Sequence, residues 1–386
     1  MRATRERPLR ILHAHSTFSL GGKEARAARL MNAFGDTAEH AILSAMPGAL
    51  GARDAIDPAI AVDFPVDAPS LQGRPELARY LALADYMRRF DLVLSYNWGA
   101  MDVVMAHRLF RATRDLPPLV HHEDGFNEDE SVRRDWKRNL FRRIALKSAD
   151  ALVVPSQTLA RIARREWRAA ERLHVIANGI ATERYAAAAR PGAIPGFARR
   201  DGDVVIGTVA GLRAVKNLPL LVAALARLPD HVRLVIVGEG PERAAIVQAA
   251  RDHGVEARVA LPGFLPDPWR YFSTFDIFSL SSLSEQAPIS LIEAMAAGLP
   301  VAACDVGDVR AMLPVGQSGF IAPPRDAEAL ARALSPLVDD AALRGKLGKA
   351  NQGHARDHFD EAAMIAAYAR LYDRALGDDA AFVSQL

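Results

Sequence analysis

Apolar, strand-like runs alternate with helix-forming segments along most of the chain, and this alternation limits the class of fold that the chain can adopt. The strand-like runs are rich in Val, Ile and Leu and occupy residues 9–15, 40–46, 91–96, 118–122, 151–155, 203–209, 232–237 and 275–280. The clearest helices are expected at residues 25–34, 75–90, 99–113 and 218–228. Because parallel strands are joined by helical crossovers, the pattern predicts an α/β fold with parallel sheets.

Length and a break in this pattern predict two domains. The 386 residues exceed the usual size of one domain. Residues 186–202 are rich in Ala, Pro, Gly and Arg and would interrupt any helix. We therefore predict an N-terminal domain over residues 1–190 and a C-terminal domain over residues 203–360.

Charge and cysteine content exclude several classes of protein. The 48 basic residues nearly balance the 46 acidic ones, so no nucleic-acid partner is expected. Cys304 is the single cysteine, which rules out an intrachain disulfide and a cysteine-rich metal site and fits a reducing compartment. The sequence shows no signal peptide and no apolar stretch long enough to span a bilayer, so a cytoplasmic location is expected, with peripheral contact at the inner membrane left open.

Residues 281–307 are the most informative stretch for function, and they predict a strand end, a loop, a helix and a second strand. Pro288 can occupy the first helical position, where its missing N–H would have no partner in any case. Gly298 can end the helix in the left-handed conformation, and Pro300 prevents the helix from continuing.

Two carboxylates in this stretch are expected to lie at the same crevice, although one is on a loop and the other on a helix. Glu285 comes from the loop and Glu293 from the helix, beside the first-turn N–H groups of Ile289 and Ser290. Such an arrangement suits a phosphorylated ligand. Each glutamate also has a purely structural explanation, Glu285 as a favourable charge at the helix start and Glu293 as a solvated residue.

The Glu285-x7-Glu293 spacing, followed by Gly-x-Pro and a strand, resembles the signature of retaining glycosyltransferases of family 4, the group 1 glycosyl transferases. The resemblance covers nearly the whole chain. It implies the GT-B fold, in which two Rossmann-like, doubly wound parallel-sheet domains face each other across a cleft. It also implies an acceptor-side N-terminal domain, a C-terminal domain that binds the nucleotide sugar, and a C-terminal helix at about 361–386 that packs back on the first domain. In such a protein Glu285 would contact the donor sugar and Glu293 the ribose.

Further donor-binding residues are expected in three glycine-containing loops. The segment Gly211-Leu-Arg213-x-x-Lys216 resembles the diphosphate loop of the family, and Arg and Lys suit phosphate oxygens, although both could be surface charges. The pair Gly21–Gly22 precedes a helix and can approach an anion, and the resemblance implies that this loop closes over the donor phosphates or the acceptor, although an ordinary strand–helix turn would also explain the pair. The resemblance assigns the nucleotide base to the turn of Gly263, Phe264 and Leu265. A further pair, Gly238-x-Gly240, lacks the third glycine of a dinucleotide site.

Polar residues follow two predicted strands of the N-terminal domain, where ligands of open α/β sheets bind. They are Asn97, His121, His122, Glu123 and Asp124, of which Asn97 and His122 are expected to contact the donor. A buried, hydrogen-bonded strand residue is an equally good explanation for either histidine. Many family members carry a histidine where this chain has Asp124, and a carboxylate there could bond a sugar hydroxyl or stabilise charge at the anomeric carbon.

Residues 131–148 predict a basic helix that carries aromatic side chains. Its cations are Arg133, Arg134, Lys137, Arg138, Arg142, Arg143 and Lys147, and its apolar residues are Trp136, Leu140, Phe141 and Ile144. A helix of this kind can lie on an anionic membrane. The favoured alternative is a solvated helix whose apolar stripe packs on the sheet.

These features predict a retaining glycosyltransferase that uses a nucleoside diphosphate sugar, with Glu285, Asp124, Arg213 and Lys216 as catalytic residues. No Asp-x-Asp motif is present at a strand end, so neither a metal nor a cofactor besides the donor is expected. The expected acceptor is a saccharide or lipid-linked saccharide of bacterial cell-surface or exopolysaccharide synthesis. The alternatives are a catalytically inactive nucleotide-sugar-binding subunit of a polysaccharide assembly complex, or a sugar-nucleotide epimerase of the same fold. Gln286 and Asp308, which replace glycines common in the family, place larger side chains near the donor.

Overall fold

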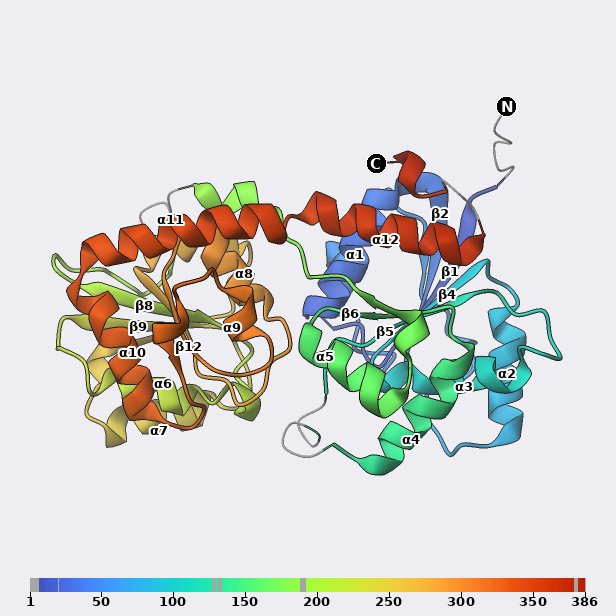
Figure 1. The fold of residues 1–386 in the computed structure, drawn as a ribbon, viewed down its shortest axis with the longest axis horizontal. Helices are drawn as coiled ribbons and strands as arrows, with labels where there is room; N and C mark the ends of the chain where they lie inside the picture. The colour runs from blue at the N-terminus through green and yellow to red at the C-terminus, as the bar shows by residue number, and fades with distance from the viewer. Residues whose placement is uncertain are drawn as a thin grey trace. The chain divides into compact units, whose positions relative to one another are not determined.

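The computed structural model describes residues 7–19, 21–126, 130, 134–187, 192–377 and 381–385. The chain divides into two compact α/β units, one formed by residues 1–177 with 363–386 and the other by residues 178–362 (Figure 1). Residues 178–187, predicted in the N-terminal domain, belong to the second unit, where Ile180 pairs with Asp360. The first three residues of the predicted basic helix, with Arg133, and residues 188–191 of the predicted linker lie outside the described ranges.

The first unit contains a seven-stranded parallel sheet in the order β3-β2-β1-β4-β5-β6-β7. Its elements are β1 (Leu9–His15), α1 (Gly22–Phe34), β2 (Ala38–Ser44), β3 (Val62–Asp63), α2 (Leu77–Met87), β4 (Leu92–Tyr96), α3 (Met101–Phe110), β5 (Leu119–His122), α4 (Trp136–Ala145), β6 (Ala151–Val154), α5 (Gln157–Ile162), β7 (Leu173–Val175) and α12 (Glu361–Leu376).

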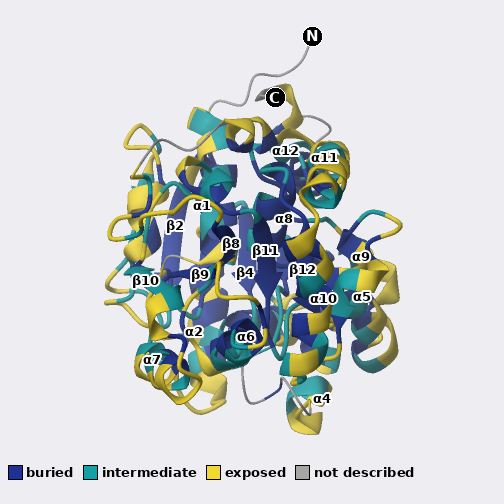
Figure 2. Ribbon diagram, turned by 90° about the vertical axis from the view of Figure 1, so that its left-hand side faces the viewer, coloured by how far each residue is buried: buried dark blue, intermediate teal, exposed yellow. Residues whose placement is uncertain are grey.

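Helices cover both faces of this sheet. On one face, side chains of α2, α3 and α5 form a core with residues such as Leu12 and Val93. On the other face, α1 and α12 pack against Ile11 and Leu94, and Tyr368 and Tyr372 of α12 are fully buried there (Figure 1). The strands between β3 and β7 are therefore buried on both sides, which explains their largely apolar sequences (Figure 2).

The second unit contains a six-stranded parallel sheet in the order β10-β9-β8-β11-β12-β13. Its elements are β8 (Val204–Val209), α6 (Leu218–Leu225), β9 (Val232–Val237), α7 (Arg243–Asp252), β10 (Val259–Gly263), β11 (Ile277–Leu280), α8 (Ile289–Ala296), β12 (Val301–Cys304), α9 (Val309–Met312), β13 (Ile321–Ala322), α10 (Ala327–Asp339) and α11 (Ala341–His358).

The core of the second unit is also two-sided. Side chains of α6, α7 and α10 pack on β8 and β9. Helix α8 packs closely against α11, because a Cβ on Gly348 would come within 1.9 Å of the Gly298 carbonyl oxygen. Gly298 has φ +74°, so it ends α8 in the left-handed conformation predicted for it.

The strand order identifies where each sheet can bind a ligand. The chain runs outward in opposite directions from β1 and β4 in the first sheet, and from β8 and β11 in the second. Loops that leave the carboxyl ends of such neighbouring strands diverge and open a crevice. A ligand site is therefore expected in the loops after β1 and β4 of the first sheet, and in the loops after β8 and β11 of the second.

Candidate functional site

The loops after β8 and β11 are tied together by direct hydrogen bonds. The Leu283 N–H donates to the Val215 carbonyl (2.8 Å), and the Ser281 hydroxyl donates to the Lys216 carbonyl (3.0 Å). These contacts bring together Lys216 and Glu285, which lie 69 residues apart in the sequence.

Lys216 and Glu285 form a partly buried ion pair. The Lys216 Nζ lies 2.5 Å from Glu285 Oε1, and the Ser282 hydroxyl donates to the same oxygen at 2.7 Å. The two side chains are 17% and 10% exposed. Both contacts use Oε1, which leaves Glu285 Oε2 as an acceptor toward a ligand, and an ammonium group carries three donors. Arg213 lies exposed on the same loop.

Glu293 is placed by helix α8 and by a tyrosine outside it. The hydroxyl of Tyr185, a buried residue, donates to Glu293 Oε1 at 2.8 Å. Helix α8 begins at Ile289, so the first-turn amides of Ile289 and Ser290 point out of its start without acceptors within the helix. Pro288 is extended (φ −67°, ψ 123°) and is the N-cap residue. It was predicted to be the first helical residue, so the helix begins one residue later than predicted.

Glycines shape the neighbouring loops by allowing backbones to touch. A Cβ on Gly238 would lie 1.9 Å from the Ala210 carbonyl oxygen, and one on Gly240 would lie 2.4 Å from that of Leu212. The Gly-x-Gly pair therefore packs the loop after β9 against the loop after β8. The Gly238 N–H donates to the Gly263 carbonyl (2.9 Å), which brings the turn of Gly263, Phe264 and Leu265 to the same edge of the sheet, with Phe264 exposed.

In the first unit, the loops after β1 and β4 pack closely. A Cβ on Gly99 would lie 2.2 Å from Cβ of Ser16, so glycine is required there. Gly21 is extended (φ −157°), and Gly22 begins α1, three residues earlier than predicted. Lys23 contacts Glu24 and the Thr17 carbonyl. Gly21 and Gly22, which are predicted to bind the donor, thus lie at the start of α1.

Asp124 is held from two sides at this edge. Arg26, a buried residue of α1, makes a bidentate ion pair with it through Nη1–Oδ1 (2.5 Å) and Nη2–Oδ2 (2.8 Å). The Asp124 N–H donates to Oδ1 of Asn97 (2.7 Å). Burial by itself would raise the pKa of Asp124, but the charge and hydrogen bonds of Arg26 outweigh burial and lower it. Asp124 is therefore an ionised residue whose position is fixed, and Asn97 has a positioning role.

The prediction that His122 contacts the donor does not fit its position. His122 is enclosed in the sheet, where Nδ1 contacts the Ser95 carbonyl (3.2 Å) and Nε2 contacts the Tyr372 hydroxyl (2.9 Å). Burial, followed by the charge of Arg26, lowers the pKa of His122 to about 3. Both ring nitrogens are engaged with the protein, so His122 is a neutral core residue. His121 is also buried and bonds Ser95.

The next residue, Glu123, is paired with the basic helix. Arg142 of α4 is fully buried and contacts Glu123 (3.1 Å) and Glu130 (3.3 Å). Its guanidinium carbon lies 4.9 to 5.3 Å from the ring centres of Trp98, Phe126 and Trp167. The inward face of α4 is therefore built around an arginine as well as apolar residues.

The outward face of α4 carries an apolar stripe. Trp136, Leu140 and Ile144, spaced four residues apart, are 68%, 46% and 42% exposed. Lys137 and Lys147 are exposed near them. The expectation that the apolar stripe packs on the sheet is thus wrong for these three residues, because Arg142 and the half-buried Phe141 occupy the inward face.

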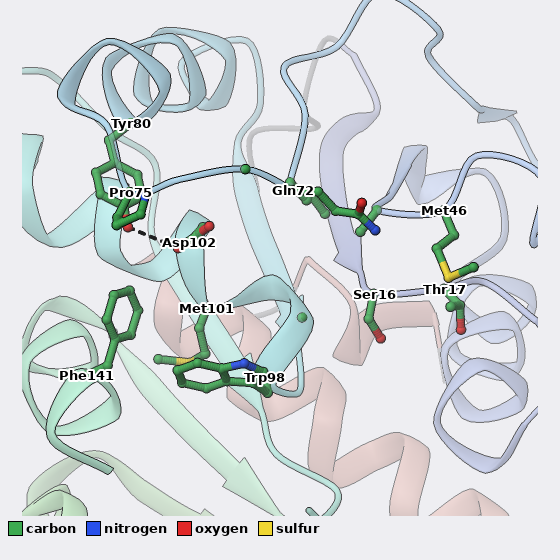
Figure 3. Close-up of a pocket in the computed structure, with 14 residues that line it drawn as sticks. Ser16, Thr17, Met46, Gln72, Pro75, Tyr80, Trp98, Met101, Asp102 and Phe141 are labelled. Atoms are coloured by element: carbon green, nitrogen blue, oxygen red, sulfur yellow. Dashed lines mark hydrogen bonds between the residues drawn. The ribbon is translucent and has the colours of Figure 1, made fainter. Parts of the chain in front are cut away.

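A pocket of about 500 Å³ opens in the first unit where the loops after β1, β2 and β4 meet (Figure 3). Its lining residues are Ser16, Thr17, Ala45, Met46, Leu71, Gln72, Gly73, Pro75, Tyr80, Trp98, Gly99, Met101, Asp102 and Phe141. The 70–74 loop is fixed by Arg79, which donates to the carbonyls of Gly73 (3.4 Å) and Arg74 (3.0 Å) and to Asp102 Oδ2 (2.6 Å).

Two family models match the chain, one on each side of residue 190. Residues 20–184 match the model described as Glycosyltransferase Family 4, and residues 193–354 match the model described as Glycosyl transferases group 1. The chain belongs to the group 1 glycosyltransferases. Its two parallel-sheet units are the Rossmann-like domains of the GT-B fold, as predicted.

Curated relatives and solved structures of glycosyltransferases are similar to this chain. LpsE of Rhizobium meliloti, a lipopolysaccharide core biosynthesis glycosyltransferase, is 31% identical over 156 residues, which are 40% of this chain and 46% of LpsE. D-inositol 3-phosphate glycosyltransferase of Corynebacterium glutamicum is 26% identical over 75% of this chain and 73% of its own length. The chain spans about half the length of LpsE and of several other curated relatives. Anabaena HepE in complex with UDP shares the fold with a TM-score of 0.77 at 21% identity, over 95% of this chain and 100% of HepE.

Four residues that support the site of this group 1 glycosyltransferase were not predicted from the sequence. Ser282 and Tyr185 bond the two glutamates, Arg26 pairs with Asp124, and Trp98 lines the pocket. Ser282 could have been found, because a hydroxyl three residues before Glu285 in a tight loop is a common partner. Arg26 offered no local signal, since its partner lies 98 residues away.

Proposed function

We propose that the chain is a retaining glycosyltransferase that moves a sugar from a nucleoside diphosphate sugar to a hydroxyl group of an acceptor. The observation that carries the proposal is the Lys216–Glu285 pair, held by Ser282 at the switch point of the second sheet. A cation and a carboxylate fixed side by side at this edge suit a ligand that joins a diphosphate to a sugar.

In the proposed reaction, the bond between the anomeric carbon and the diphosphate oxygen breaks, and the acceptor oxygen bonds the same carbon from the same face. The acceptor proton passes to the leaving diphosphate oxygen. Lys216 and Arg213, with the amides of Ile289 and Ser290, stabilise the charge that develops on that oxygen. Glu285 bonds a hydroxyl of the donor sugar through Oε2, and Glu293 bonds the ribose.

Lys216, Arg213 and the amides of Ile289 and Ser290 can stabilise a leaving diphosphate without a metal ion, so we propose that the reaction is independent of a divalent cation and of any other cofactor. HepE, which shares the fold, was crystallised with UDP-glucose as well as with UDP, and uridine nucleotides are therefore the first donors to test. The names of relatives such as LpsE support an acceptor in cell-surface polysaccharide or lipopolysaccharide synthesis.

The release of nucleoside diphosphate from a panel of nucleotide sugars tests the proposal. We expect slow release from one donor without acceptor, and a loss of roughly 100-fold in Lys216→Met, the scale of removing one charge-stabilising donor. Lys349→Met, which alters an exposed lysine of α11, is the matched control. A protein that binds a nucleotide sugar but releases no diphosphate, with or without saccharide acceptors, would instead be a non-catalytic binding subunit.

We also infer that α4 makes a peripheral contact with an anionic membrane surface. The stripe of Trp136, Leu140 and Ile144, flanked by lysines, has the chemistry of a helix that lies in the interface. Within the described ranges, no helix is long and apolar enough to cross a membrane. Co-sedimentation with vesicles containing phosphatidylglycerol should fall in Leu140→Ser/Ile144→Ser, and unchanged sedimentation would refute the contact.

A further inference from the structure

The pocket of the first unit has two chemically different walls. Trp98, Met101 and Phe141 form an apolar side, and Ser16, Thr17 and Gln72 direct hydroxyl and amide groups from another side (Figure 3). The volume of about 500 Å³ falls in the range of small-molecule sites. A ligand that fits must therefore offer an apolar face and, on its other side, groups that form hydrogen bonds.

The charges around the pocket restrict the class of ligand more than its shape does. Asp102 is the one charged side chain among the described lining residues, and it is neutralised by Arg79 (2.6 Å) and bonded by the Tyr80 hydroxyl (3.0 Å). The cations that touch lining residues have acidic partners: Arg79 with Asp102, Lys23 with Glu24, Arg138 with Glu130, and Arg142 with Glu123 and Glu130. A phosphate or carboxylate that entered would lose its hydration without gaining a counter-charge.

The pocket is also physically continuous with the loop that holds Asp124. Trp98 directly follows Asn97, and Asn97 Oδ1 accepts the Asp124 N–H. Gly99 packs on Ser16 with no room for a side chain, so the apolar and polar walls are fixed relative to each other. A ligand seated on Trp98 therefore lies beside the carboxyl-end crevice of the first sheet rather than at a remote surface.

We propose that this pocket binds the acceptor, and that the acceptor presents to it an uncharged saccharide ring carrying an apolar aglycone. The C–H face of the ring stacks on Trp98, its hydroxyls bond Ser16, Thr17 and Gln72, and the aglycone contacts Met101 and Phe141. The proposal rests on the transferase function above and adds to it a selectivity against phosphorylated and carboxylated acceptors.

Calorimetric titration of the full chain with matched glycosides, in the presence of UDP, tests the assignment. The probes are octyl glycosides of glucose, galactose and mannose, the octyl glycosides of glucuronic and galacturonic acid, and methyl glucoside. We expect at least one neutral octyl glycoside to bind roughly tenfold or more tightly than its uronide and than its methyl analogue.

Three variants locate the binding. Trp98→Leu removes the aromatic face but keeps an apolar side chain, and Thr17→Val removes a rim hydroxyl without disturbing the core; each should weaken the neutral glycoside roughly tenfold. Met46→Lys adds a cation at an exposed lining position and should shift the preference about tenfold toward the uronide. Val66→Lys, fully exposed and outside the lining, is the matched control and should shift nothing.

The results separate this proposal from the transferase itself. Uronides that bind as tightly as neutral glycosides, or neutral binding that is unaffected in both Trp98→Leu and Thr17→Val, would overturn the acceptor assignment while UDP release from the donor continued. Suppose that the affinity for neutral octyl glycosides changes in the variants as expected, but the protein releases no UDP from any donor. The saccharide site would then be supported, and the proposed transferase activity would be refuted.

Discussion

The buried pair of Arg26 and Asp124 makes a quantitative prediction about stability. The Arg26 side chain is 4% exposed and the Asp124 side chain 16%, and two parallel hydrogen bonds join them. Breaking a buried pair by removing one partner typically costs about 3–5 kcal/mol, because the other charge stays buried. For a unit of this size each kcal/mol lowers the melting temperature by roughly 2–4 °C, so Asp124→Asn should melt roughly 6–20 °C lower.

Differential scanning calorimetry of four proteins tests this reasoning: the parent, Arg26→Met, Asp124→Asn and the double variant. The double variant should lose much less than the sum of the single losses, because it leaves no uncompensated charge. Arg114→Met, which breaks an exposed pair with Asp85 in the same unit, is the matched control and should lose about 1 kcal/mol or less. Single variants that melt like the parent, or strictly additive losses, would refute the claim that this pair supports the fold.

The pH dependence of the same pair has a defined sign. The pKa of Asp124 is lowered in the folded protein, so its contribution is present above the unfolded carboxyl pKa of about 3.9 and is lost as pH falls through the folded pKa. The difference in melting temperature between the parent and Asp124→Asn, which lacks the titrating carboxyl, should therefore be constant from pH 5 to 8 and should narrow only below about pH 4. A difference that changes between pH 6 and 7 would point to another group.

Three further predictions concern the donor site. Tyr185→Phe should weaken UDP about three- to tenfold in calorimetric titration, because Glu293 loses the hydroxyl that orients it; unchanged affinity would mean that this bond does not position Glu293. Glu293→Ala should weaken both UDP and the donor, whereas Glu285→Ala should keep UDP affinity and lower turnover by roughly 100-fold, and the reverse pattern would exchange their roles. EDTA should leave the rate of UDP release largely intact, and a loss that is restored by Mg²⁺ or Mn²⁺ would contradict stabilisation of the leaving group by Arg213 and Lys216.

The fold was largely predictable because most strands of both sheets are buried on two sides. Runs such as Val232–Val237 are continuously apolar and have flanks that favour turns, so local sequence identifies them. Strands β3 and β13 have two residues each and carry too little pattern to be recognised. Most helix ends moved by one to three residues and the start of α4 moved by five, because caps such as Pro288 and Asp135 depend on the backbone path of the preceding loop.

The sequence indicated candidate residues within single loops and helices, but it did not indicate which distant residues contact one another. Lys216 and Glu285 were proposed from separate segments, and the sheet order β8-β11 brings their loops together. No local pattern could pair Arg26 with Asp124, because that contact depends on the order β1-β4-β5 and on α1 crossing the sheet. The prediction that His122 contacts the donor does not fit the structure for a related reason. A residue at the carboxyl end of a strand can face a core helix, here α12, rather than the crevice.

Gln286 and Asp308 stand near Glu285 at positions where glycine is common in the family. The backbone at these two positions shows whether glycine is needed there. Gly307 has φ +58°, and a Cβ there would lie 2.1 Å from the Glu285 carbonyl oxygen, so glycine is needed for both conformation and space. Asp308 has φ −101°, a value that any residue adopts, and its N–H donates to the Gln286 carbonyl (2.9 Å). Gln286 is likewise absent from the described residues with positive φ. The backbone path that positions Glu285 therefore does not require glycine at 286 or 308, and we expect the larger side chains here to alter the space beside Glu285 rather than that path.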